Sequence, residues 1–223
     1  MTAQSAILSR LRTALQVPAD DKSRKAAVAA RLKSAPNGVI PARAQLPKGQ
    51  QVELFHAMAD KYSATIDRVK SAKEVPAAVS AYLRSKNLPS RAAIGSDARL
   101  AAMPWKSEKH LELKVGPSDG FDETGISHAF AAIAETGTLV MTSGADNPTT
   151  LNFLPENHIV VLQASQVMGD LESVMAQVRK TYGKGVMPRT VNFITGPSRS
   201  GDIEQKILLG AHGPRALHVV LVG

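Results

Sequence analysis

The C-terminal stretch FITGPSRSGDIEQKILLGAHGPRALHVVLVG, residues 193–223, decides the fold class. It starts inside one apolar segment, TVNFITG (190–196), and ends in another, ALHVVLVG (216–223). A third segment, HIVVLQA (158–164), has the same character. Nearly continuous apolar runs of this length are typical of strands covered on both faces. The stretch therefore predicts an α/β fold with a mostly parallel sheet flanked by helices.

The chain before residue 190 supports this prediction, because helical and extended patterns alternate along it. The predicted helices are 52–63, 74–87, 128–135 and 166–183, and the further predicted strands are 64–69, 91–96, 110–116 and 136–143. Residues 97–110 are expected to be irregular. A long polar loop is expected at 143–157, and loops of this length are often functional.

The N-terminal residues have a different organisation. Ile7, Leu8, Leu11 and Leu15 recur at helical spacing, and the Ala-rich segment 21–34 is also helical in character. Three prolines and two glycines in residues 36–49 indicate an extended linker. We therefore expect an N-terminal helical arm and linker at 1–48, followed by an α/β domain at 49–223.

The composition excludes several kinds of site. There is no cysteine, so this chain has no thiol nucleophile and no thiolate ligand for zinc or an iron–sulfur cluster. No two histidines have metal-ligand spacing, so no metal site is expected. The sequence also has neither an apolar run of about 18 residues nor a secretory signal pattern, which favours a cytoplasmic protein without a membrane span.

The net charge of +8 is unevenly distributed. Residues 1–100 hold 17 Lys and Arg against 7 Asp and Glu, whereas residues 101–223 hold 10 against 12. The basic residues thus gather in the N-terminal half, where they fit the solvated face of a helix. With no interleaved aromatic and basic pattern, nucleic acid is not expected as a partner.

The segment TGPSRSGDIE (195–204) admits two interpretations. In the first, Gly196 permits a sharp turn and Ser198 or Ser200 caps a helix whose positive end is matched by Asp202. In the second, the free N–H groups of the turn and Arg199 hold a carboxylate or phosphate. Asp202 would compete with such an anion, although it could bind a hydroxyl or an amine instead.

Two further segments offer candidate site residues. Glu135 precedes a predicted strand beside Thr136, Gly137 and Thr138, and is either a turn carboxylate satisfied by local amides or a general base that faces a cleft. His212 lies in LGAHGPR, a constrained loop, where it either holds the loop by hydrogen bonds or takes a proton from a hydroxyl group of a substrate. His218 alternates within a strand and is expected to be packed.

Three stretches in order, AIAETGTLVM (132–141), NFLPENHIVVL (152–162) and GPSRSGDIEQKILLGAHGPRALHVVLV (196–222), resemble the lactate-utilization protein C family, whose domain is called LUD. The resemblance covers roughly 50–223 and is densest in 125–222. It implies a fold related to sugar-phosphate isomerases, CoA-transferases and formyltetrahydrofolate cyclo-ligases. It also implies a role, with two iron–sulfur partner proteins, in oxidising L-lactate to pyruvate. The sequence departs from many members at Ser200-Gly201, which stand where those have Thr-Ala before the acid.

The resemblance and the residues together give one expected function and two alternatives. The expected function is that of a non-metal subunit of an L-lactate utilization system, with iron–sulfur clusters on its partners and a 2-hydroxy acid as its small-molecule ligand. Its candidate catalytic residues are Glu135, Asp202 and His212. Its candidate substrate-binding residues are Thr136, Gly137, Thr138, Gly196, Ser198, Arg199 and Arg215, the two arginines for the substrate carboxylate. The alternatives are a stand-alone enzyme that binds a phosphate or acyl-CoA ligand, and a structural assembly module.

Overall fold

The computed structural model describes residues 2–18, 20–203, 206–210 and 212–223, with the backbone alone described at 201–203 and 206–209. The chain divides into two compact units, Met1–Val39 and Ile40–Gly223. The first unit holds α1 (Ala3–Ala14) and α2 (Lys22–Ser34), which bury none of their residues. The side chains of Thr2 and Asp21 cap these helices by accepting hydrogen bonds from backbone N–H groups. In the described part of the chain, no helix has the length and apolar character needed to cross a membrane.

The second unit is built on a six-stranded sheet in which every neighbouring pair of strands is parallel. This confirms the predicted α/β fold. In spatial order the strands are β1 (Thr65–Val69), β12 (Ala216–Val222), β7 (Asn157–Gln163), β4 (Thr124–His128), β2 (Arg91–Ile94) and β3 (Glu112–Val115). The two apolar runs singled out in the sequence, β7 and β12, are neighbours in the centre of this sheet, where both faces are covered.

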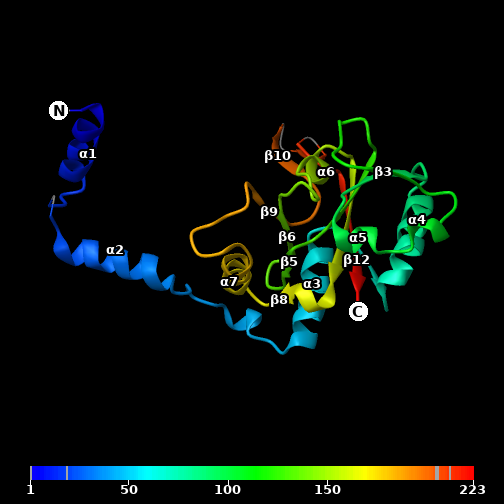
Figure 1. Ribbon diagram of the computed structural model, residues 1–223, viewed down its shortest axis with the longest axis horizontal. Helices are drawn as coiled ribbons and strands as arrows, with labels where there is room; N and C mark the ends of the chain where they lie inside the picture. Colours follow the sequence, from blue (N-terminus) through cyan, green and yellow to red (C-terminus); the bar gives the residue numbers. More distant parts are fainter. Residues whose placement is uncertain (1, 19, 204–205, 211) are drawn as a thin grey trace. The chain divides into compact units, whose positions relative to one another are not determined.

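Helices and a second sheet cover the two faces (Figure 1). The helices of this unit are α3 (Lys48–Lys61), α4 (Val75–Ser85), α5 (Ala98–Ala101), α6 (Thr150–Phe153) and α7 (Leu171–Tyr182). Short 3-10 turns lie at η1 (Ala42–Ala44), η2 (Ala72–Glu74), η3 (Trp105–Ser107) and η4 (Ala164–Gln166). The second sheet has the order β8 (Val167–Met168), β5 (Ala131–Ile133), β6 (Thr138–Thr142) and β9 (Val191–Ile194).

The core has two main layers, one on each face of the six-stranded sheet. Val79 and Leu83 of α4 pack with Val220 of β12 on one face. On the other face, Phe55 of α3 and Met141 of β6 pack with Leu221. Successive residues of β12 thus point to opposite layers, as the two-residue period of a strand requires. A smaller cluster with Val140 and Val174 joins α7 to the outer face of the second sheet.

The predicted helix at 128–135 is wrong. His128 ends β4, and Ala131–Ile133 forms β5, which pairs with β6 and β8. The alanines of this segment favour a helix locally, but Ala129, Ala132 and Ala134 are buried between the two sheets and Ala131 is buried under α7, where small side chains permit close packing. Likewise the helix predicted from residue 166 begins only at Leu171, because the side chain of Asp170 accepts a hydrogen bond from the N–H of Ser173 and caps it there.

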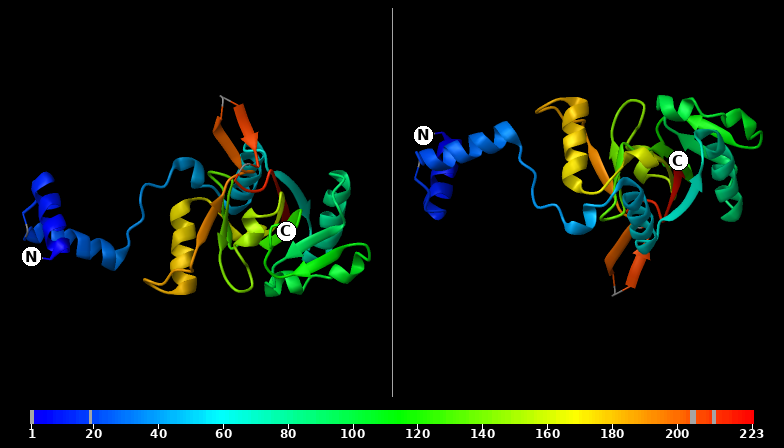
Figure 2. Two further views of the ribbon diagram at one scale, coloured as in Figure 1. Left: turned by 90° about the horizontal axis from the view of Figure 1, so that it is seen from above. Right: turned by 90° about the horizontal axis from the view of Figure 1, so that it is seen from below.

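The helix that was one interpretation of residues 198–204 is absent from the described residues of this segment. The backbone instead forms a hairpin of β10 (Arg199–Ile203) and β11 (Lys206–Leu209), which projects from the body of the unit (Figure 2). The strand register shifts between Ser200 and Ile203, so Gly201 and Asp202 lie in the irregular part of the ladder. Without a helix start here, the helix dipole gives no support for an anion site at this turn.

Truncation of Leu221 to Ala should cost about 2–5 kcal/mol of the free energy of unfolding, because this side chain is fully buried in the centre of the sheet. Urea unfolding followed by circular dichroism measures the loss. Val115→Ala is the matched control, since Val115 is 66% exposed on the edge strand β3 and should change stability by less than about 1 kcal/mol. Equal losses for the two variants would contradict the central position of β12.

Candidate functional site

A cavity of about 300 Å³ opens at the amino ends of β7 and β12. Its walls come from four parts of the chain that the sheet brings together. They are the end of β9 with the turn after it (193–199), the loop 212–214, residues Asn152 and Phe153 of α6, and the strand residues His158 and Leu217. A cavity of this size suits a small-molecule ligand.

Backbone contacts hold the two loops of the cavity in place. The N–H of Ser198 donates to the carbonyl oxygen of Pro214 at 2.8 Å. The N–H of Gly210 donates to the carbonyl oxygen of Ser198 at 3.0 Å. Gly196 has a φ of +69°, and a Cβ atom there would lie 2.1 Å from the carbonyl oxygen of Tyr62. Only glycine fits this position, so the turn is fixed against the C-terminal end of α3.

The floor of the cavity is a buried polar network. The Nε2 atom of His158 lies 2.6 Å from the hydroxyl of Ser127, and this hydroxyl lies 3.2 Å from Oδ1 of Asn152. The three side chains are almost completely buried. If the single proton of Ser127 is donated to Asn152, then Nε2 of His158 is the N–H donor to Ser127, and its Nδ1 carries a lone pair.

Burial lowers the pKa of His158 to about 3, so its imidazole is neutral at physiological pH. Its Nδ1 atom is buried and has no hydrogen-bond partner among the residues described. A buried polar atom without a partner costs free energy unless a ligand or water reaches it. His158 therefore has one ring nitrogen available for a further hydrogen bond, but it is too weakly basic to take up a proton at neutral pH.

Four of the predicted site residues line this cavity: Gly196, Ser198, Arg199 and His212. Nη2 of Arg199 donates to the carbonyl oxygen of Tyr62 and to the hydroxyl of Ser63, which anchors the guanidinium at the end of α3. The remaining N–H groups of this side chain have no hydrogen-bond partner in the described part of the chain. His212 is exposed at the rim, and its imidazole forms no hydrogen bond with another described residue.

The predicted group at 135–138 lies outside the lining of the cavity but is linked to it. The hydroxyl of Thr138 lies 2.7 Å from those of both Thr136 and Thr195, and Thr195 lines the cavity. Gly137 has a φ of +65° and packs against the backbone of α3. The buried carboxylate of Glu135 lies 3.8 Å from Nε of Arg43.

Two further predicted residues lie elsewhere. Arg215 forms an exposed ion pair with Glu156 at 3.3 Å and does not line the cavity. Such exposed pairs contribute little to stability. Asp202 lies in β10, and its side chain is outside the described residues. The roles predicted for these residues, and for Glu135, remain predictions.

Sequence reasoning missed the floor of the cavity. Asn152 was expected only as part of a polar loop, His158 opened a predicted strand without a role, and Ser127 was not singled out. A signal was present, because GISHAF (125–130) places Ser127 inside an apolar segment. Polar residues in a buried central strand need partners, and that need points to a network.

No metal centre accompanies this site in the part of the chain that the structure describes, where no three His, Asp or Glu side chains are grouped to hold an ion. The arrangement instead offers neutral hydrogen-bonding groups on the floor, with a guanidinium and an imidazole at the rim. These groups suit a small anion that also carries a hydroxyl or carbonyl oxygen.

The buried His158 should make the folded chain sensitive to acid. Below pH 6.5 the unfolded chain protonates this histidine, whereas the folded chain does so only near pH 3. The unfolded state therefore binds more protons in this window, and the free energy of unfolding falls as the pH drops. Between pH 7.5 and pH 5 the loss from this one residue should be about 2 kcal/mol, measured by urea unfolding.

His158→Gln should remove that share of the pH dependence, while His110→Gln, at an exposed position, should keep it. An unchanged difference between the two pH values in His158→Gln would show that this histidine titrates normally in the folded chain.

Comparison with known proteins bears on the part of the chain that forms the cavity. Residues 120–222 match the family model described as LUD domain. A protein named lactate utilization protein C from Geobacillus thermodenitrificans (strain NG80-2) is 36% identical over 107 residues, which are 46% of this chain and 45% of that relative. A protein of the same name from Bacillus subtilis (strain 168) is 33% identical over 99 residues, 44% of this chain and 41% of the relative. The chain thus spans less than half the length of these curated relatives.

A solved structure supports the fold alone. It is the crystal structure of a DUF162 family protein from Deinococcus radiodurans, which superposes with a TM-score of 0.56 at 22% identity and covers 80% of this chain and 99% of its own. The family model and the curated relatives, by contrast, confirm over residues 120–222 the resemblance that the sequence predicts, to the LUD domain of lactate utilization protein C.

Proposed function

We propose that this chain is the non-metal subunit of a cytoplasmic L-lactate utilization system and that its cavity binds the 2-hydroxy acid. One observation carries the proposal: every residue that lines the cavity falls within 120–222, the region that matches the LUD domain. The relatives that share this region are named for lactate utilization. The cavity has the size and the polar groups that a small hydroxy acid needs.

Oxidation of L-lactate to pyruvate releases two electrons and two protons, and the electrons need an acceptor. The 223 residues contain no cysteine, so they supply no thiolate ligand for an iron–sulfur cluster. The proposal therefore assigns the electron carriers to iron–sulfur partner proteins. This chain supplies substrate binding and proton transfer.

Within the cavity, the groups divide by their chemistry. The N–H groups of Arg199 that do not contact α3 bind the substrate carboxylate, since a guanidinium pairs well with a carboxylate. On the floor, the amide Nδ2 of Asn152 donates a hydrogen bond to the substrate hydroxyl oxygen, and His158 supports Asn152 through Ser127, so the single hydroxyl proton stays free for a base. His212 at the rim takes the hydroxyl proton, since imidazole is the side chain that most often serves as a general base.

The other predicted site residues support this arrangement from outside the cavity. The hydroxyl groups of Thr136, Thr138 and Thr195 lie within hydrogen-bond distance of one another in sequence, and this chain positions the end of β9. The carboxylate of Glu135 pairs with Arg43 and so holds the 3-10 turn η1. We place no substrate contact on Arg215, whose guanidinium pairs with Glu156.

Loss of this chain in its own host should abolish growth on L-lactate and leave growth on pyruvate unchanged. Restoring the gene with His212→Ala should lower L-lactate oxidation in cell extracts about 10²–10⁴-fold, the usual range for removal of a general base. His110→Ala, also exposed, is the matched control and should restore full activity. Normal growth on L-lactate without the chain would refute the function, and full activity of His212→Ala would refute the role of this imidazole.

A further inference from the structure

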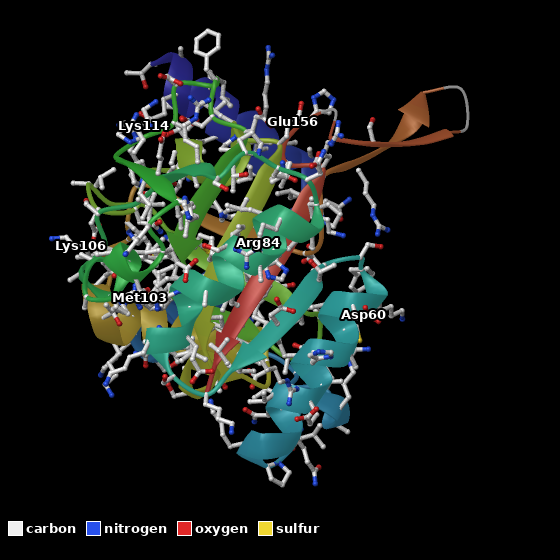
Figure 3. All side chains as sticks on the ribbon, turned by 90° about the vertical axis from the view of Figure 1, so that its right-hand side faces the viewer. Asp60, Arg84, Met103, Lys106, Lys114 and Glu156 are labelled. Atoms are coloured by element: carbon white, nitrogen blue, oxygen red, sulfur yellow. The ribbon has the colours of Figure 1, made fainter. Side chains whose placement is uncertain are left out.

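The cavity of the candidate site is larger than its proposed ligand. Its volume of about 300 Å³ lies within the range of ~300–1,000 Å³ that takes drug-sized ligands. L-Lactate, whose side chain is a single methyl group, fills only part of such a space. In Figure 3 the label of Glu156, the residue before β7, marks the end of the sheet at which the cavity opens and from which the hairpin of β10 and β11 projects. The space that lactate leaves empty therefore bears on which 2-hydroxy acids the cavity selects.

The polar groups of the cavity account for two of the substituents on the reacting carbon. In the proposed function, Arg199 binds the carboxylate, and the amide of Asn152 donates a hydrogen bond to the hydroxyl oxygen. The third substituent is the side chain of the acid, which needs a wall of its own. Apolar walls are available to it, and they are formed by Phe153, Ile194, Pro197, Pro214 and Leu217.

Among these five residues, Phe153 has the most exposed side chain. It is 38% exposed, and its ring contacts no other aromatic ring among the described residues. The preceding residue of α6, Asn152, turns inward to Ser127, and one step along a helix rotates the next side chain by about 100°. A Cβ atom on Gly213 would lie 3.8 Å from Cδ1 of Phe153, so the edge of the ring borders the loop 212–214. The helix α6 thus supplies a polar contact for the hydroxyl group and an apolar wall beside it.

The core holds two further apolar walls in place. Leu217 is 3% exposed, and Ile194 packs against the core cluster between the two sheets. Phe193 also borders the cavity, but it is the register partner of Val140 and shares the outer face of the second sheet with it. The ring of Phe153 is therefore the aromatic surface that a ligand in the cavity can cover.

We propose that the cavity selects 2-hydroxy acids whose side chain is larger and more apolar than the methyl group of lactate, with an aromatic side chain as the best fit. Phe153 determines this preference, because two rings that stack or meet edge to face gain more than the area they bury. L-Lactate uses the same polar groups but leaves the apolar walls uncovered. The inference rests on the proposed function, since it needs the carboxylate and hydroxyl contacts of a 2-hydroxy acid.

Isothermal titration of the full chain with L-lactate, L-2-hydroxyisocaproate and L-3-phenyllactate tests the proposal. L-3-Phenyllactate should bind at least about tenfold more tightly than L-lactate, and L-2-hydroxyisocaproate should bind with intermediate affinity, because each apolar carbon removed from water adds to binding. 3-Phenylpropionate has the ring and the carboxylate but no hydroxyl group. It should bind about tenfold more weakly than L-3-phenyllactate, because the amide of Asn152 is left without its partner.

Variants of Phe153 test the wall itself. Phe153→Ala should weaken the binding of L-3-phenyllactate about tenfold and change that of L-lactate by less than about twofold, and Phe153→Leu should recover part of the loss. Phe121→Ala is the matched control, since Phe121 is 87% exposed and does not line the cavity, and it should leave both affinities unchanged. Thermal unfolding of the free variants establishes that they are folded.

The outcomes separate this inference from the proposed function. If L-lactate binds and L-3-phenyllactate binds no more tightly, the inference is wrong and the proposed function stands. If none of the three 2-hydroxy acids binds at millimolar concentration, the inference fails together with the assignment of this cavity to a 2-hydroxy acid. Unchanged binding of L-3-phenyllactate by Phe153→Ala would overturn the role of this ring, and equally tight 3-phenylpropionate would show that the cavity does not select a hydroxy acid.

Discussion

The parallel pairing of β7 with β12 is the contact on which the rest of the structure depends. The strands are in register from Asn157–Ala216 to Gln163–Val222, and most of their side chains are completely buried. The strand β12 lies between β1 and β7, so β1 joins the six-stranded sheet only when β12 is in place. The same register sets His158 beside Leu217 and brings the loop 212–214 over α6, which forms the cavity.

The pairing also explains why two histidines are buried so close together. His158 shares the face of the sheet that carries Val160 and Val219, whereas His218 shares the opposite face with Val220. Each has a lowered pKa and one ring nitrogen without a hydrogen-bond partner within the described chain. Each position keeps a polar ring inside an apolar layer, at a cost in stability that an apolar residue would avoid.

The sequence predicted the parallel sheet because the apolar runs of β7 and β12 are typical of strands that are covered on both faces. It also predicted four residues that line the cavity, because glycine, proline and histidine mark constrained loops. It failed where tertiary contacts override local preference. The alanines of 129–134 favour a helix in isolation but are buried on the two faces of the second sheet. Arg199 starts a hairpin strand where a capped helix was one expectation. The buried Ser127 indicates that a partner is needed, but its partners Asn152 and His158 could not be predicted, because they come from separate elements that only the sheet register brings together.

The central claim is that a 2-hydroxy acid binds at the amino ends of β7 and β12, over the buried floor of His158. The most direct measurement is a titration of the chain, labelled with ¹⁵N at histidine, with L-lactate, followed through the imidazole resonances. We predict saturable shifts for His158 and His212 and none for His218. Shifts confined to other histidines, or no shift of His158 at saturating L-lactate, would contradict the account.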